Sequence, residues 1–251
     1  MEIALTILFF ILGLIFGSFF NVVGLRLPKN KPFTNDRSFC PSCNHSLGWH
    51  ELIPVLSFIM QLGKCRHCKS TISPIYPIGE LVTGILFALS YTKIGLELEL
   101  ITALLLVSML MIIFVADIKY MLIPDKVLLF FLPLFIVFRF LQPLDSWLTS
   151  IAGAITGIGI TAVIILVSKG GMGAGDMKLF GVLGIVLGLK GILLTFFLSI
   201  IIGAIIGSIL LLSKLINRKQ PIPFGPYIVI ASIITYFYGT SIMDWYFQLY
   251  I

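Results

Sequence analysis

The sequence predicts an all-α polytopic membrane protein with about eight transmembrane helices and a small zinc-ribbon-like module after the first helix. Of the 251 residues, 59% are hydrophobic and only 11% are charged, and the mean hydropathy is +1.10. Apolar runs of roughly 17–25 residues recur, the length that crosses about 30 Å of hydrocarbon as a helix. All four cysteines lie in one polar stretch. This composition excludes an ordinary soluble domain.

The apolar runs set the order of the predicted elements. They lie near residues 3–25, 76–93, 98–116, 126–143, 146–168, 177–190, 191–213 and 226–243. The least defined boundary is the one after Lys190, because 177–213 is almost continuously apolar. We therefore expect a first transmembrane helix in 1–25, a cytoplasmic tetracysteine module in 26–75 and a transmembrane bundle in 76–251.

The distribution of Lys and Arg predicts the orientation. With 26–75 inside, fourteen of the seventeen basic residues fall on the cytoplasmic side, which follows the positive-inside rule. The fourteen are Arg26, Lys29, Lys31, Arg37, Lys64, Arg66, Lys69, Lys119, Lys126, Lys169, Lys178, Lys214, Arg218 and Lys219. Both termini are then expected outside. Attraction to anionic lipid accounts for the net charge of +6, so no nucleic-acid partner is expected.

The cysteines of the polar segment are spaced like metal ligands. Cys40 and Cys43 form one Cys-x-x-Cys pair, Cys65 and Cys68 form another, and 21 residues separate the pairs. Four thiolates at such spacing typically bind one structural Zn²⁺, and a reducing cytoplasm favours metal over disulfides. Disulfides or free thiols remain the alternative. His45, His50 and His67 are expected at the surface or beside the metal, although any of them can replace a thiolate.

Two acidic residues lie at the edges of apolar runs, where a charge is costly and indicates function. Asp117 ends the run 98–116, and Asp176 precedes the run 177–190 after Gly173-Ala174-Gly175. The predicted topology places both acids at the same cytoplasmic boundary. Each acid could instead mark a helix end and contact only water, but that would not require the glycines, which allow close backbone approach.

A pair of close carboxylates suits peptide hydrolysis. One carboxylate activates water and the other donates a proton, because two like charges a few Å apart do not both ionise cheaply. Asp176 is predicted near a helix N-terminus and Asp117 near a C-terminus, so the helix dipole favours the anion at Asp176. We therefore expect Asp117 to hold the shared proton at rest.

Other polar and small residues have two interpretations each. Asp125 is either an N-cap of the helix that begins near Lys126 or a competing catalytic acid. Glu80 either satisfies a polar partner within the bundle or faces a site at the cytoplasmic edge. Small-residue spacing in the later helices indicates close helix packing rather than a cofactor site; these residues are Gly153, Gly157, Gly159, Gly203 and Gly207.

Motifs along nearly the whole chain resemble those of the prepilin peptidases, the GxGD-type intramembrane aspartyl proteases. The matching residues are 16–23, 26–28, both Cys-x-x-Cys pairs, 73–77, 80–84, 116–117, 123–125, 173–178 and 223–226. By this resemblance Asp117 and Asp176 take the positions of the catalytic pair. Pro223-Phe224-Gly225-Pro226 is expected to interrupt the chain at the last cytoplasmic turn, and the resemblance offers a second role for it at the mouth of the site.

The resemblance also implies the substrate and the compartment. Members of the family act in bacterial plasma membranes, cutting the short basic leader from type IV prepilins, pseudopilins and competence pseudopilins on the cytoplasmic side, after a glycine. Many also methylate the new N-terminal amine with S-adenosylmethionine, although this sequence shows no G-x-G-x-x-G nucleotide fingerprint. The expected partners are therefore a prepilin substrate and membrane lipid.

Two other classes of function remain open from the residues alone. Acids within apolar runs and glycine-interrupted helices also occur in proton-coupled membrane transporters. Against a transporter, the acids lie at the boundary rather than the midplane, and the cysteine module has no role in it. A membrane assembly factor with inactive acids is the third class.

Overall fold

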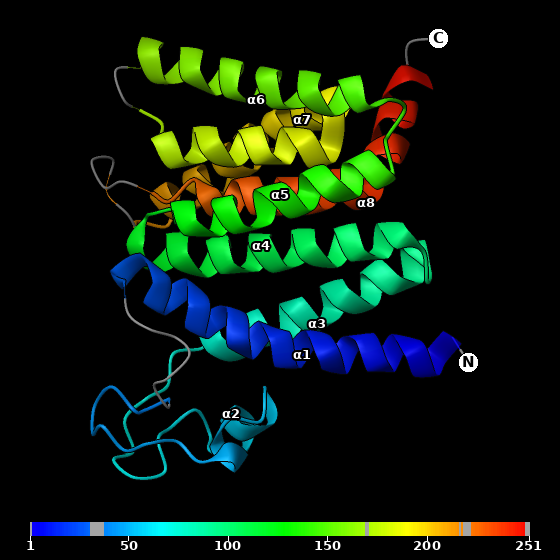
Figure 1. Cartoon of the computed structure of the whole chain (residues 1–251). Coiled ribbons are helices and arrows are strands. Elements are labelled where there is room, and N and C mark those ends of the chain that lie inside the picture. Colours follow the sequence, from blue (N-terminus) through cyan, green and yellow to red (C-terminus); the bar gives the residue numbers. More distant parts are fainter. Residues whose placement is uncertain (1, 31–37, 169–170, 216, 218–221, 249–251) are drawn as a thin grey trace. The chain divides into compact units, whose positions relative to one another are not determined.

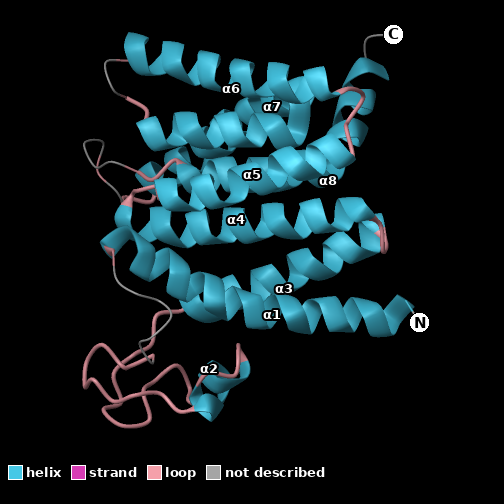
Figure 2. Ribbon diagram, in the orientation of Figure 1, coloured by secondary structure: helices cyan, strands magenta, loops and turns pink. Residues whose placement is uncertain are grey.

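The computed structural model describes residues 2–30, 38–168, 171–215, 217 and 222–248. Within these residues the secondary structure is helical apart from two isolated β-bridges, and the longest non-helical stretches lie between residues 38 and 74 (Figure 2). The chain divides into two compact units, residues 1–115 and 116–251. The predicted functional division at residues 25 and 75 remains a prediction.

The first unit contains two closely packed helices, α1 (Glu2–Arg26) and α3 (Ile75–Ile94), and most of α4 (Leu98–Tyr120). A Cβ atom added to Gly17 of α1 would lie only 2.8 Å from the Cα of Glu80 in α3. The two backbones therefore meet without an intervening side chain. The described part of the polar segment between them contains three short helices, η1 (Leu27–Lys29), η2 (Trp49–Glu51) and α2 (Leu56–Met60).

The second unit begins within the last turns of α4 and continues through four further helices: α5 (Asp125–Leu141), α6 (Trp147–Val167), α7 (Ala174–Leu212) and α8 (Gly225–Gln248) (Figure 1). Glycines join α6 to α7, as predicted: a Cβ at Gly153 would lie 2.4 Å from the carbonyl oxygen of Gly184. Gly157 and Gly203 also lie in close contacts. A Cβ atom added to Gly159 would meet no described atom within 4 Å, so this glycine is not needed for close helix packing.

The helix α7 reverses direction at Gly188, which has φ +69° and ψ −176°. The rings of Phe180 and Phe196, on either side of this residue, lie 5.8 Å apart. A straight helix would separate two residues sixteen positions apart by about 24 Å. Both limbs therefore lie side by side, and Figure 1 shows the second limb returning behind the first. The break frees the carbonyl of Val186, which accepts a hydrogen bond of 3.0 Å from Nε of the buried Arg139 in α5.

The predicted count of about eight spans differs slightly from the structure. Among the described residues, six helices are long and apolar enough to cross a membrane. The difference lies in α5, which has only 17 residues, and in α7, whose two limbs count as one helix. The predicted boundary after Lys190 lies two residues beyond the observed reversal. Of the charges used to predict orientation, Lys31, Arg37, Lys169, Arg218 and Lys219 lie outside the described residues.

Candidate active site and metal centre

Asp117 lies inside the last turn of α4 rather than after it, since this helix continues to Tyr120 and is followed by Met121, which has φ +51°. Its side chain is buried, with the residue 5% exposed. The backbone N–H of Gly225 donates a hydrogen bond of 2.9 Å to Asp117 Oδ2. Because α8 begins at Gly225, the carboxylate lies at the N-terminus of that helix.

Asp176 lies in the first turn of α7, because this helix begins at Ala174 and not after the acid as predicted. The residue is 9% exposed, and the backbone N–H of Gly173 donates to its Oδ2 at 3.1 Å. A Cβ at Gly175 would lie 3.1 Å from the Cβ of Ile123, so the glycine brings the chain after α4 against the start of α7.

The two acids form a buried pair within the second unit. Asp117 lies near enough to Asp176 for their charges to repel one another. The interpretation in which both acids contact only water is therefore wrong. Each carboxylate also accepts from a backbone N–H at the start of a helix. The two environments differ less than helix polarity suggested, because α8 supplies Asp117 with the N-terminal dipole that α4 does not. That Asp117 holds the shared proton stays a prediction.

Asp125 has a different role from the predicted N-cap. The N-cap position of α5 is Pro124, and no side chain caps this helix. Asp125 is instead the first residue of α5, and its carboxylate oxygens accept from Lys178 Nζ at 2.7 and 2.9 Å. Both side chains are about half exposed, at 56% and 49%. The ion pair ties the start of α5 to the first turns of α7, where Asp176 lies.

The four cysteines of the first unit lie on two turns of similar geometry. In the first, the N–H of Cys40 donates to His45 O, and Asn44 N–H donates to Cys40 O; in the second, Cys65 and Lys69 repeat this pattern with Ser70. Asn44 and Lys69 have φ values of +55° and +60°. Paired turns of this kind direct backbone N–H groups toward the thiols. Those of Ser42 and Cys43 lower the pKa of Cys40 to about 6, which favours the metal-binding thiolate.

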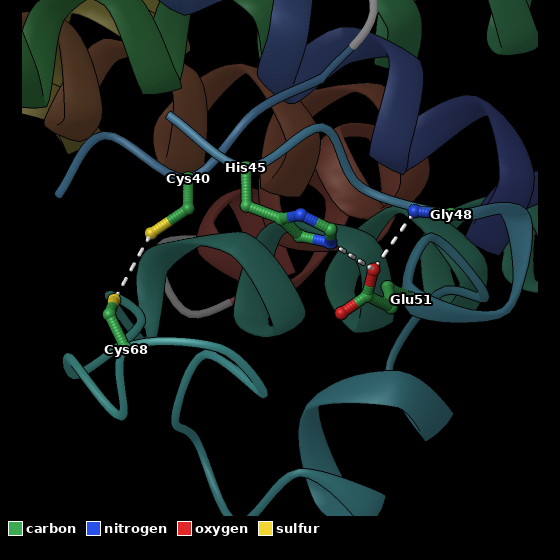
Figure 3. Close-up of polar contacts among 5 residues, drawn as sticks. All are labelled: Cys40, His45, Gly48, Glu51 and Cys68. Atoms are coloured by element: carbon green, nitrogen blue, oxygen red, sulfur yellow. Dashed lines mark hydrogen bonds and ion pairs between the residues drawn. The ribbon is translucent and has the colours of Figure 1, made fainter. Parts of the chain in front are cut away.

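The sulfur atoms of Cys40, Cys43, Cys65 and Cys68 fit one tetrahedral metal ion. All four lie within 4.8 Å of one another, and the sulfurs of Cys40 and Cys68 are 3.8 Å apart (Figure 3). Zn–S bonds of about 2.3 Å place tetrahedral sulfurs about 3.8 Å apart. This separation does not match a disulfide, and all four cysteines are free. These residues can therefore bind a metal with their sulfurs alone, a closed set that suits a structural ion.

His45 and His67 lie on the cysteine turns, and none of the three histidines is among the four residues that could hold a metal. The rings of His45 and His67 stack with centroids 4.1 Å apart, which joins the two cysteine turns. His45 Nε2 also lies 3.8 Å from Glu51 Oε2, which accepts from Gly48 N–H at 2.9 Å (Figure 3). These contacts place His45 and His67 next to the cysteines without making them members of the cluster.

Removing the buried pair of thiols should remove the metal. We expect the purified wild-type protein to contain about one zinc per chain, and the double variant Cys40→Ser/Cys65→Ser to contain almost none, because two of four ligands are lost. The segment 38–74 should then exchange its amide hydrogens faster. Elemental analysis and hydrogen exchange measure the two effects.

Ser42→Ala is the matched control, since this exposed residue lies between Cys40 and Cys43. It should keep both the zinc and the slow exchange. A double variant that retains a full complement of zinc would show that the cysteines are not the ligands.

Two family profiles cover most of the chain. The bacterial peptidase A24 N-terminal domain matches residues 11–94, and the type IV leader peptidase family matches residues 104–208, which include both acids. A protein of Bacillus subtilis (strain 168) named prepilin leader peptidase/N-methyltransferase is 45% identical over 240 residues, covering 96% of this chain and 97% of the relative. The chain belongs to the type IV leader peptidase family.

More distant relatives of this family carry the same name. Those of Aeromonas hydrophila and Pseudomonas aeruginosa are 34% and 33% identical, and each alignment covers 95% of this chain and 92% of the relative. No solved structure is a significant match. Membership in this peptidase family decides against the transporter and the assembly factor that the residues alone left open.

Sequence reasoning missed two contacts at the acids. Gly225 was expected only to interrupt the chain and, by resemblance, to line the site, whereas its N–H binds Asp117 directly. Lys178 was counted only as a positive charge, whereas it binds Asp125.

Proposed function

We propose that this protein is a membrane aspartic endopeptidase that removes the basic leader of type IV prepilins or pseudopilins, with Asp117 and Asp176 as its catalytic pair. The observation that carries the proposal is the buried pair itself. Two carboxylates from α4 and α7 lie together, each with one backbone N–H donor, in a chain of the leader peptidase family.

This arrangement can perform both proton transfers of peptide hydrolysis. The ionised carboxylate takes a proton from water as the water oxygen bonds to the carbonyl carbon. The protonated carboxyl then gives its proton to the leaving amine as the C–N bond breaks. The N–H groups of Gly173 and Gly225 hold one oxygen of each acid, which leaves the other oxygen for these transfers.

The name shared by the relatives supports a second activity, methylation of the amine that cleavage releases. In this reaction a methyl group passes from the sulfonium of S-adenosylmethionine to the amine nitrogen, which loses one proton. The sulfur keeps the electron pair of the broken bond and leaves as a thioether. The basic residues around the cysteines and near the acids support a plasma-membrane location with the site at the cytoplasmic face and both termini outside.

One reaction tests both activities. Purified wild-type protein in detergent is mixed with a prepilin that has a glycine before the cut, with and without S-adenosylmethionine, and the product is read by mass spectrometry. We expect leader removal in both samples and one added methyl group only when the donor is present. An intact prepilin would exclude the peptidase, whereas a cleaved but unmethylated product would exclude only the methyltransferase.

A further inference from the structure

Glu80 is a buried carboxylate in the first unit that the peptidase does not use. It lies in α3, and the residue is 8% exposed. The backbone N–H of Val55 donates to its Oε2 at 2.8 Å, and the side chain of Ser18 in α1 forms a second hydrogen bond with the carboxylate. A buried acidic side chain between two apolar helices indicates a functional role.

Asn21 provides a second buried oxygen acceptor in the same pair of helices, α1 and α3. It lies one turn after Ser18 in α1 and is only 2% exposed. Its Nδ2 donates to Tyr76 O at 3.0 Å, but its Oδ1 has no hydrogen-bond partner. That oxygen lies against Gly79, the residue before Glu80, and would be 2.8 Å from a Cβ atom added to this glycine. Leaving a buried acceptor unpaired is unfavourable, so a donor is expected here.

The backbone at Val55 is strained where it meets Glu80. Val55 has φ +60° and ψ −50°, a conformation that a β-branched residue rarely adopts. Backbone strain of this kind is found preferentially at functional sites. An anchor between the polar segment and α3 would explain the Val55–Glu80 hydrogen bond, but it would leave the oxygen of Asn21 unexplained. A bound donor accounts for that oxygen.

We propose that Glu80 and Asn21 bind an ammonium group of a methylation reactant. An ammonium has three N–H donors and a positive charge, which match one carboxylate and one amide oxygen. This chemistry occurs in the amino group of S-adenosylmethionine and in the new N-terminal amine of the cleaved pilin. The inference rests on the proposed methyltransferase activity and assigns a site to it in the first unit. Gly79 is required because any side chain there would displace Asn21.

The test compares Glu80→Gln and Asn21→Leu with wild type in four measurements: the Kd of S-adenosylmethionine, the Kd of a peptide with the cleaved pilin N-terminus, methylation, and leader removal. Glu80→Gln nearly conserves side-chain volume, whereas Asn21→Leu keeps the branched shape but is larger, so the thermal unfolding midpoint is measured for both variants. We expect at least one Kd to rise about 10-fold or more, because a hydrogen bond to a charged group is lost. Methylation should fall with it, and leader removal should stay within about twofold. Ser90→Ala is the control, since its buried hydroxyl bonds only to Leu86 O of α3, far along the helix.

The two arms identify the source of the ammonium. A weakened Kd for S-adenosylmethionine assigns the site to the donor. A weakened Kd for the peptide, with no change for its N-acetylated form, assigns it to the acceptor. Unchanged values for both ligands in both variants would overturn the proposal while wild-type methylation stands. Wild-type protein that cleaves but neither binds S-adenosylmethionine nor methylates would instead refute the methyltransferase activity, and the inference with it.

Discussion

Asp117→Asn and Asp176→Asn should each lower the rate of leader removal by about 10²–10⁴-fold or more, the range for loss of a general acid or base. An amide neither accepts a proton from water nor supplies one to the leaving amine. Asparagine keeps the shape of the side chain and can still accept from Gly225 or Gly173 through its Oδ1. The measurement is single-turnover cleavage of a prepilin in detergent across a range of pH. The double variant should cleave about as fast as the less active of the two single variants, because the pair acts as a unit.

Asp125→Asn is the matched control for these two variants. It removes a carboxylate from the same unit, but one that is half exposed and paired with Lys178. Exposed ion pairs contribute little, so cleavage should stay within about fivefold of wild type. Substantial cleavage by either Asp117→Asn or Asp176→Asn at any pH would eliminate the dyad. A loss confined to Asp125→Asn would move the chemistry to that acid.

Gly225→Ala should lower cleavage by about 10²-fold while the protein stays folded. The added Cβ would lie 2.6 Å from Asp117 Oδ2, in the space that the carboxylate occupies. The carboxylate must move, and its hydrogen bond from the Gly225 N–H is lost. A displacement of about 1 Å at a reacting group costs on the order of 10²-fold in rate. The measurement is kcat for leader removal beside the thermal unfolding midpoint.

Gly207→Ala provides the comparison for a glycine of the same unit. Its nearest neighbour across the added Cβ is the side chain of Ile222 at 4.0 Å, so a methyl group fits without displacement. Cleavage by this variant should match wild type. Wild-type kcat in Gly225→Ala would show that the backbone contact does not position Asp117 for catalysis.

Much of the fold follows from the sequence because apolar length alone sets where a helix can cross lipid. Runs such as 98–116 and 126–143 predicted α4 and α5 to within a few residues. The helix ends were less accurate. Hydropathy does not mark Met121, whose positive φ terminates α4. It also does not mark Gly188, where α7 reverses direction. These ends depend on backbone conformation, which the hydropathy of the run does not encode.

For the candidate site too, the sequence predicts some features and not others. The costly position of Asp117 and Asp176 beside apolar runs could be read from the sequence, and so could the spacing of the cysteines. The partners of these residues could not. Lys178 binds an acid 53 positions away, and Gly225 binds one 108 positions away. A backbone N–H leaves no side-chain signal at all. Asn21 could have been noticed, because a polar residue within the first apolar run meets the rule that singled out the two acids.

The reversal of α7 at Gly188 determines whether the chain crosses the membrane an even or an odd number of times between α4 and α8. Between the end of α4 and the start of α8 the chain crosses four times, through α5, α6 and both limbs of α7. An even number returns α8 to the side of Asp117, where the N–H of Gly225 reaches the carboxylate. An unbroken α7 would make the number odd and carry Gly225 to the opposite leaflet. One left-handed glycine thus decides on which side of the bilayer Asp117 meets its hydrogen-bond donor.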